Sequence, residues 1–532
     1  MSVTCWLALA AVVGYLIDAA GLGVQAWGAL AIALLITGAG AFSPRQKVFT
    51  LSDLIAVIGI VLFVTATLIR VSWPSLVPPG RGPDLTHHLL LVDYIEQNHH
   101  LVHDRSLDGA MGEMAHYTPA AHLLAVMAGT WFGSDGLHAF FPLTVFCAAL
   151  TAALVFLIAR RHGLSLPIAI SATVLLLLPS QYFVGAFTHD SFLAQTVSTL
   201  FAVAMWWAII NWDDQPTILN ASIIAVFLLA VFLSWPIWLG PPLLVFLALV
   251  LRADLSAGDR RAYLAIVLLP FLALALLHSW DRWGWMVIVR TSGAVLHPSL
   301  ESLGWLLPVL AAIGSLAALL DQRTRISVAL LLVIGLQMVT LFVIAKAQGA
   351  ETPYMAFKMV YLAIYPMAVL AAIGMARVAG ALRAPEPVGW LVAAVLLIGA
   401  ARPALTAPRS VPVVTDDLYA AGKWLRANGG ASCADYLVTD AETAYWLHLA
   451  VLGNPRSAER MKDIDRDPRA AVASWIASEG RRYAIADLRL LPDEVLRAGR
   501  AGSTRPEGAE VIAQFGSAAV IKRRDATIKG CD

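Results

Sequence analysis

The stretch "RISVALLLVIGLQMVTLFVIA" (residues 325–345) decides the fold class of this protein. After one arginine it has no further charged side chain over about 20 residues, the length that a helix needs to cross the hydrocarbon core of a bilayer. Hydrophobic residues make up 59% of the 532-residue chain and charged residues only 14%, against about 25% in soluble domains. The sequence therefore predicts a polytopic α-helical membrane protein.

Similar apolar runs recur from the N-terminus to about residue 404. We expect about thirteen transmembrane helices, near residues 3–20, 24–43, 50–72, 137–159, 165–184, 192–210, 217–234, 236–251, 261–278, 301–320, 325–345, 357–378 and 387–404. The first of them lacks a basic leader and an A-x-A-like cleavage site, so we expect it to be retained. The run 118–134 is apolar but short, and we expect it to lie at the membrane interface or dip in without crossing.

Lysines and arginines in short loops predict the sidedness of the helices. One assignment places every basic cluster in the cytoplasm, provided that 118–134 does not cross; the clusters are Arg45 and Lys47, Arg160 and Arg161, Arg252 with Arg260 and Arg261, Arg323 and Arg325, and Arg377 with Arg383. The N-terminus is then cytoplasmic. The loop 73–136, with its interfacial helices, and the segment 410–532 are then extracytoplasmic.

The pattern also divides the chain into a transmembrane module, residues 1–404, and a small soluble α/β domain, residues 410–532. In the latter, "DDLYAAGKWLRAN" (416–428) predicts a helix, and "EVIAQFGSAAVIKRR" (510–524) predicts two strands around a turn. "SWIASEGRRYAIADL" (474–488) predicts a helix and then a strand. Cys433 and Cys531 share this domain, and they either form one disulfide or remain two thiols.

The densest group of titratable residues is "GPDLTHHLLLVDYIEQNHHLVHD" (82–104), with four acidic residues and five histidines. His87 and His88 lie three and four residues after Asp84, so in a helix each of them is a neighbour of Asp84. A carboxylate at the membrane surface suits a general base that accepts a proton from a hydroxyl. The alternative is that Asp84 merely caps the helix.

Histidines in this number raise the possibility of zinc, with Asp84, His87 and His88 as ligands. Adjacent histidines point to different faces of a helix, however, so we expect no metal and no other cofactor. We expect instead that these histidines form hydrogen bonds to lipid or sugar hydroxyls. Further candidates for substrate or donor binding are His116, Tyr117, His189, Lys346, Tyr354, Lys358, Arg282 and Arg290, and Asp190 is a second candidate catalytic carboxylate. Each lysine either snorkels to the interface or pairs with a lipid phosphate.

The acidic residue in the first large loop is followed by "YTPAAHLL" (117–124), which resembles the aromatic–proline segment of the GT-C superfamily of membrane glycosyltransferases. "PYMAFKMVYLAIYP" (353–366) is similar to the lysine-bearing segment of the arabinofuranosyl and mannosyl branches. The sequence departs from the family at "YTP" in place of "YPP", and the first loop has no D-x-D. The resemblance implies that Asp84 is the base and that Lys358 lies near the donor phosphate.

The resemblance further implies an inverting transfer of a sugar from a polyprenyl-phosphate donor to a hydroxyl of a glycan, lipid or protein, at the outer face of a bacterial inner membrane. The net charge of +1 gives no reason to expect a nucleic-acid partner. Three alternatives stay open: a transporter or flippase, an O-antigen-ligase-like enzyme, and a scaffold. Mid-span positions are almost free of charged residues, which favours chemistry at the membrane surface over transport.

Overall fold

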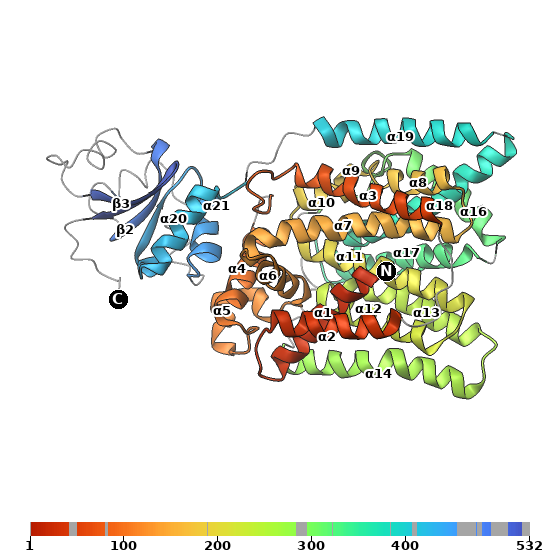
Figure 1. The fold of residues 1–532 in the computed structure, drawn as a ribbon, viewed down its shortest axis with the longest axis horizontal. Coiled ribbons are helices and arrows are strands. Elements are labelled where there is room, and N and C mark those ends of the chain that lie inside the picture. The colour runs from red at the N-terminus through yellow and green to blue at the C-terminus, as the bar shows by residue number, and fades with distance from the viewer. Residues whose placement is uncertain are drawn as a thin grey trace.

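A computed structural model of the chain describes residues 2–41, 50–79, 83–188, 190–282, 295–321, 323–383, 385–406, 412–454, 475, 481–490 and 509–523. Within these ranges, long helices run side by side in a bundle, and a small sheet domain lies beyond one end of it (Figure 1). The same end carries α4 (Pro83–Asn98), α5 (Asp108–Met111) and α6 (Ala120–Phe132). We call it the domain-bearing end.

Seven helices of the described part are long and apolar enough to cross a membrane. They are α1 (Ser2–Ala19), α3 (Leu51–Ile69), α7 (Gly136–Arg161), α11 (Leu193–Asp214), α14 (Ala257–Asp281), α17 (Arg325–Ala347) and α18 (Tyr354–Ala381). Each overlaps a span expected from hydropathy. The protein is therefore a multi-pass helical membrane protein, as the sequence predicted.

Shorter apolar helices complete the bundle. They are α2 (Ala26–Ala41), α6, α8 (Leu166–Leu175), α12 (Ile218–Ser234), α13 (Gly240–Arg252), α16 (Leu306–Leu319) and α19 (Glu386–Thr406). All but α6 overlap an expected span, so the total of thirteen crossings stays a prediction. With 13 residues, α6 is about 20 Å long, well short of the bilayer core.

The expectation of one continuous helix over 165–184 is wrong. In the structure α8 ends at Leu175, and two single-turn helices follow, α9 (Ser180–Phe183) and α10 (Gly185–Thr188). Pro179 explains the break, because proline has no N–H to donate and disfavours helical geometry in the residue before it. Hydropathy misses the break because the residues on both sides are apolar.

Helix α18 is held against α16 by two glycines. A side chain at Gly314 would overlap the backbone of Leu370, and one at Gly374 would overlap the backbone of Leu310. Small residues let membrane helices approach this closely, and the packing gains contact along the whole interface. This contact fixes α18, which carries Lys358.

Short elements join the helices at their ends. The described ones are η1 (Arg105–Leu107), η2 (Gly112–His116), η3 (Pro236–Leu239) and α15 (Leu300–Leu303). Within the segment 73–136 the structure has α4, η1, α5, η2 and α6.

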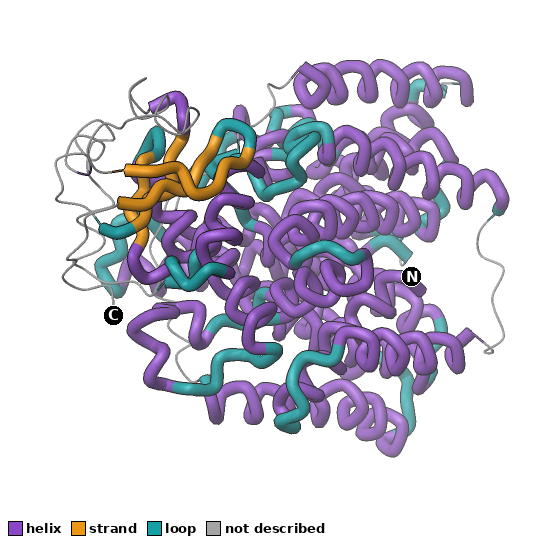
Figure 2. The backbone as a smooth tube through the Cα atoms, turned by 60° about the vertical axis from the view of Figure 1, so that its left-hand side comes forward, coloured by secondary structure: helices purple, strands orange, loops and turns teal. Residues whose placement is uncertain are grey.

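The C-terminal domain has, among its described residues, a four-stranded sheet in the order β1-β2-β4-β3. Its strands are orange in Figure 2. Strands β1 and β2 pair in parallel, and the other pairs are antiparallel. Its elements are α20 (Asp416–Ala427), η5 (Ala431–Cys433), β1 (Ala434–Leu437), α21 (Ala441–Trp446), η6 (Leu447–Val451), β2 (Tyr483–Asp487), η8 (Leu488–Leu490), β3 (Ala509–Phe515) and β4 (Ala518–Arg523).

Three expectations for this domain are confirmed: helix α20, strand β2 and the β3–β4 hairpin. The helix expected just before β2 lies almost wholly outside the described residues. Cys433 is disulfide-bonded, whereas Cys5 and Cys147 are free. Cys531 lies outside the described residues.

Candidate active site at the domain-bearing end

Lys358 lies in the second turn of α18 and is buried, with 2% of its surface exposed. Its Nζ atom is 2.7 Å from the ring centroid of Phe192, 4.8 Å from that of Tyr354 and 5.4 Å from that of Trp235. Within the described part of the chain, no oxygen accepts a hydrogen bond from this ammonium. A buried cation is costly without an anion, so the aromatic faces stabilise the charge only in part.

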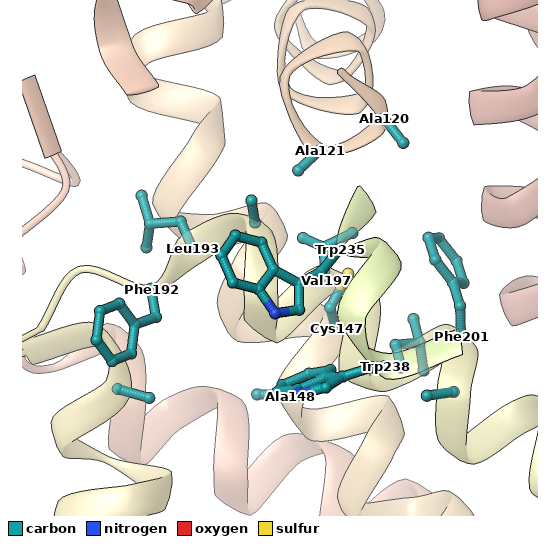
Figure 3. Close-up of a cluster of buried hydrophobic side chains, with 14 of the residues drawn as sticks. Ala120, Ala121, Cys147, Ala148, Phe192, Leu193, Val197, Phe201, Trp235 and Trp238 are labelled. Atoms are coloured by element: carbon teal, nitrogen blue, oxygen red, sulfur yellow. The ribbon is translucent and has the colours of Figure 1, made fainter. Parts of the chain in front are cut away.

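Two of these aromatic neighbours, Phe192 and Trp235, belong to a cluster of buried hydrophobic side chains (Figure 3). Phe192 precedes α11, and Trp235 lies between α12 and η3. Trp238 from η3 lies below them and is fully buried. The lysine is therefore held by rigid elements and not by a surface loop.

The charges of two carboxylates, Asp84 and Asp190, act on the ammonium of Lys358. Asp190 follows α10, and its Oδ2 accepts a hydrogen bond of 2.8 Å from the hydroxyl of Tyr361, one turn after Lys358 on α18. Asp84 is the second residue of α4 and is exposed. We call Asp84, Asp190, Tyr354, Lys358 and Tyr361 the charged cluster.

No hydrogen bond among the described residues supports the alternative that Asp84 merely caps the helix. The helix begins at Pro83, so Asp84 lies inside the first turn and not at the cap position. None of the described residues donates a hydrogen bond to its carboxylate. An exposed carboxylate without such donors is available to accept a proton from a bound hydroxyl.

His88 lies one turn beyond Asp84 and is buried. Its Nδ1 shares a hydrogen bond of 2.9 Å with Nε2 of His122 on α6, and the ring of Tyr117 stands edge-on to both. Burial lowers the pKa of His88 to about 4. At neutral pH the ring is therefore uncharged and adds no second cation beside Lys358.

His87 connects the site to the C-terminal domain. Its Nδ1 is hydrogen-bonded to Glu113 of η2, and its Nε2 lies 2.6 Å from the hydroxyl of Tyr445 on α21. Glu113 and Tyr445 were not among the expected site residues. The segment "YTPAAHLL" (117–124) follows Glu113 closely in the sequence, but no local sequence pattern indicates Tyr445.

The C-terminal domain also contacts α4 directly. Asp93 of α4 is buried and forms an ion pair of 2.7 Å with Arg426 of α20, and Lys423 is 4.0 Å away. Burial raises the pKa of Asp93 in spite of these cations. Nearby, the Tyr419 hydroxyl donates a 2.8 Å hydrogen bond to Asp135, which caps α7.

The other expected residues lie apart from the charged cluster. Lys346 is exposed at the end of α17, where its ammonium donates to the carbonyls of Ala350 and Glu351. His116 pairs with Asp108 at 3.4 Å. Arg282 is buried at the end of α14. His189 and Arg290 lie outside the described residues.

Among the described residues, no three histidines, cysteines or acidic residues lie together in a way that could hold a metal ion. His87 and His88, the candidate zinc ligands, direct their rings to different partners, Glu113 and Tyr445 for one and His122 for the other.

No family model matches the chain, and no curated protein matches its sequence. Solved structures do match. Arabinofuranosyltransferase AftD from Mycobacteria aligns with a TM-score of 0.51 and 13% identity, over 88% of this chain and 41% of AftD. ArnT from Cupriavidus metallidurans bound to undecaprenyl phosphate aligns with a TM-score of 0.48 and 14% identity, over 88% of this chain and 97% of ArnT.

The oligosaccharyltransferase of Archaeoglobus fulgidus aligns with a TM-score of 0.44 and 14% identity, over 81% of this chain and 68% of that enzyme. At this identity the likeness to AftD is one of fold, and this chain spans less than half of the AftD length. The expected GT-C-like fold is confirmed.

Proposed function

We propose that the protein is an inverting membrane glycosyltransferase. It moves a sugar from a polyprenyl-phosphate donor to a hydroxyl of a glycan, lipid or protein at the extracytoplasmic face. The observation that carries the proposal is the buried ammonium of Lys358, which has no hydrogen-bond acceptor among the described residues and lies under the influence of Asp84 and Asp190. A lipid phosphate is an anion that reaches such a site from the membrane.

In this mechanism Asp84 takes the proton of the acceptor hydroxyl as its oxygen attacks the anomeric carbon. The bond between that carbon and the phosphate oxygen breaks, and its electron pair leaves with the phosphate. Lys358 stabilises the charge that grows on this oxygen, so it contributes more in the transition state than in the ground state. The products are the glycoside, with inverted configuration, and polyprenyl phosphate, while Asp84 passes its proton to water.

Asp190 has a supporting role in this scheme. Its hydrogen bond from Tyr361 fixes one carboxylate oxygen, and its charge acts on the ammonium of Lys358. The negative charge of Asp190 favours the charged form of the lysine, which binds the donor phosphate. Tyr354, whose ring contacts the same ammonium, forms part of the wall around the donor.

The test uses the purified full-length chain, a panel of polyprenyl-phosphate sugars, and envelope membranes as the source of acceptors. We expect at least one donor to lose its sugar and yield polyprenyl phosphate. Turnover of a nucleotide sugar in place of every lipid-linked donor would contradict the proposal.

A further inference from the structure

His87 of α4 is the middle member of a hydrogen-bonded chain of three side chains that come from three separate elements. The residue is buried, with 5% of its surface exposed. Its Nδ1 is bound to Oε1 of Glu113 on η2, and its Nε2 lies 2.6 Å from the hydroxyl of Tyr445 on α21. The rings of His87 and Tyr445 also meet edge to face, with their centroids 5.8 Å apart. The contact between α4 and the C-terminal domain is therefore specific in both distance and orientation.

The partners of His87 determine where its ring proton lies. A carboxylate accepts hydrogen bonds and donates none, so Nδ1 carries the proton that Glu113 accepts. Nε2 is then an acceptor, and the hydroxyl of Tyr445 donates to it. Loss of this hydroxyl would leave a buried nitrogen without its donor, which costs more than the hydrogen bond itself contributes.

The start of α4 is held from two sides at this point. His88, the next residue, shares a 2.9 Å hydrogen bond with His122 on α6. One histidine thus joins α4 to the bundle, and the other joins it to the C-terminal domain. Asp84 lies three residues before His87 on the same helix, so the two are neighbours on its surface. A shift of His87 therefore moves the carboxylate of Asp84 with it.

Other contacts hold the C-terminal domain on the bundle at different places. Arg426 of α20 pairs with Asp93, in the later half of α4, and the Tyr419 hydroxyl donates to Asp135 at the cap of α7. Helix α21 and η6 pack against α4, and Figure 1 shows α21 beside the end of the bundle that carries α4. Loss of the Tyr445 hydroxyl would therefore leave the domain attached while it releases the start of α4.

We propose that Tyr445 is a positioning residue of the transfer reaction: through His87 it fixes the start of α4, and so the place of the Asp84 carboxylate. The C-terminal domain is then part of the active site and not only an attached module. This inference rests on the proposed function, because it needs Asp84 to act as the base. Lys358 lies on α18 and takes no part in this contact, so donor binding does not depend on Tyr445.

Tyr445→Phe in the full-length protein removes the hydroxyl and keeps the ring. With the polyprenyl-phosphate sugar that the wild type turns over, kcat should fall about tenfold to a hundredfold, because misplacement of a reacting group by about 1 Å has an effect of that order. The KM for the donor should not change. Tyr419→Phe, which removes a hydroxyl from the same domain interface, is the matched control and should keep the kcat of the wild type.

A double-mutant cycle separates positioning from a merely structural role. If Tyr445 acts through Asp84, then Asp84→Asn should reduce kcat less in the Tyr445→Phe protein than in the wild type, since the base is already misplaced there. In the Tyr419→Phe protein the effect of Asp84→Asn should be the full one. Equal effects in all three backgrounds would overturn the proposal, as would a Tyr445→Phe protein with the kcat of the wild type.

Glu113→Gln tests the other end of the chain, should Tyr445→Phe fail to fold, at a side chain that is 54% exposed. An amide can donate to Nδ1, which moves the ring proton to Nε2 and reverses the hydrogen bond with Tyr445. We expect kcat to fall about threefold to tenfold, again with an unchanged KM for the donor.

Hydrogen exchange at the start of α4 needs no donor, and it should be faster in Tyr445→Phe than in Tyr419→Phe. Transfer by the wild type without this difference in exchange would overturn the inference alone. Absence of transfer from every lipid-linked sugar, with the difference in exchange present, would overturn the proposed function and with it the role of Tyr445 in catalysis.

Discussion

The ammonium of Lys358 and the carboxylate of Asp84 occupy opposite kinds of environment, although each lies in the first or second turn of its helix. The lysine is enclosed by aromatic rings, whereas the aspartate is exposed. A base must reach the acceptor hydroxyl in water, whereas a cation attracts a phosphate more strongly in a site from which water is excluded. The difference in burial therefore agrees with the two proposed roles.

Asp84→Asn keeps the size of the side chain but removes its ability to accept a proton. If Asp84 is the base, turnover should fall about 10²- to 10⁴-fold, while binding of the polyprenyl-phosphate donor should persist. The measurement is single-turnover transfer beside a donor-binding titration. Asp104→Asn, at an exposed cap residue of η1, serves as the control. Full activity of the Asp84→Asn protein would remove Asp84 from the mechanism.

Lys358→Met keeps the apolar stem of the side chain and removes the charge. We expect weaker donor binding and, in addition, slower transfer at saturating donor, because the charge on the leaving phosphate grows in the transition state. Lys522→Met, the same change in β4 of the C-terminal domain, should leave both unchanged. A Lys358→Met protein with unaltered KM and kcat would mean that the lysine is only a packing residue.

The lowered pKa of His88 predicts how the free energy of unfolding depends on pH. Its pKa in the folded protein is about 4, below the ordinary 6.5, so between these values the unfolded chain binds a proton that the folded chain does not. Stability should therefore fall as the pH drops from 6.5 toward 4, by at most about 1.4 kcal/mol per pH unit from this group. Thermal unfolding followed by tryptophan fluorescence should show a shallower pH dependence for His88→Gln.

His99 provides the control for this experiment. It is exposed at the end of α4, and its positive φ of 55° suits asparagine. His99→Asn should keep the pH dependence of the wild type. An identical slope in His88→Gln would show that the buried ring does not govern acid stability.

At the scale of elements, the ion pair between α4 and α20 holds the C-terminal domain on the bundle. Arg426→Met would leave the Asp93 carboxylate buried with only Lys423 nearby, and we expect a loss of up to about 3 kcal/mol. Hydrogen exchange in α4 and the apparent Tm should both report the loss. Adding Asp93→Asn to Arg426→Met should restore much of it, since no buried charge remains.

Arg489→Met is the comparison for that pair, because Arg489 binds Asp487 within one domain and is 69% exposed. Because Asp487 is itself buried, the loss of Arg489 should also lower the stability of the C-terminal domain, but hydrogen exchange in α4 should stay unchanged, since both residues lie within that domain. A double variant of Asp93 and Arg426 that is no more stable than the single one would argue against the ion pair as the anchor.

Local sequence patterns predict most of the helices, and they single out two residues of the charged cluster. Hydropathy places α18 and the loop at α4, so Lys358 and Asp84 stand out as charges at the ends of apolar runs. The same reasoning misses Tyr445, because its contact with His87 joins residues 358 positions apart and depends on how the domain docks. It also misses the break at Pro179, since the apolar run continues through the residues that leave the helix.

At the scale of the whole molecule, charges gather at two opposite groups of helix ends. Asp84, Asp190 and Lys358 belong to the domain-bearing end. Away from it, Arg160 pairs with Asp53 and Arg161 with Asp214, each at 2.6 Å, and the charges of Arg252 and Arg325 act on Asp213. Loops that the sequence assigns to the cytoplasm are thus neighbours in space.

This separation leads to a prediction of topology. Thirteen crossings place the N-terminus in the cytoplasm and residues 410–532 outside, with the basic clusters inside because positively charged loops are retained there. Asn428→Cys, in the turn after α20, should react with a membrane-impermeant maleimide on intact cells. Asp254→Cys, in the exposed loop between α13 and α14, should react only after permeabilisation. The reverse pattern would place the charged cluster in the cytoplasm, where nucleotide sugars are available, and would remove the reason for a lipid-linked donor.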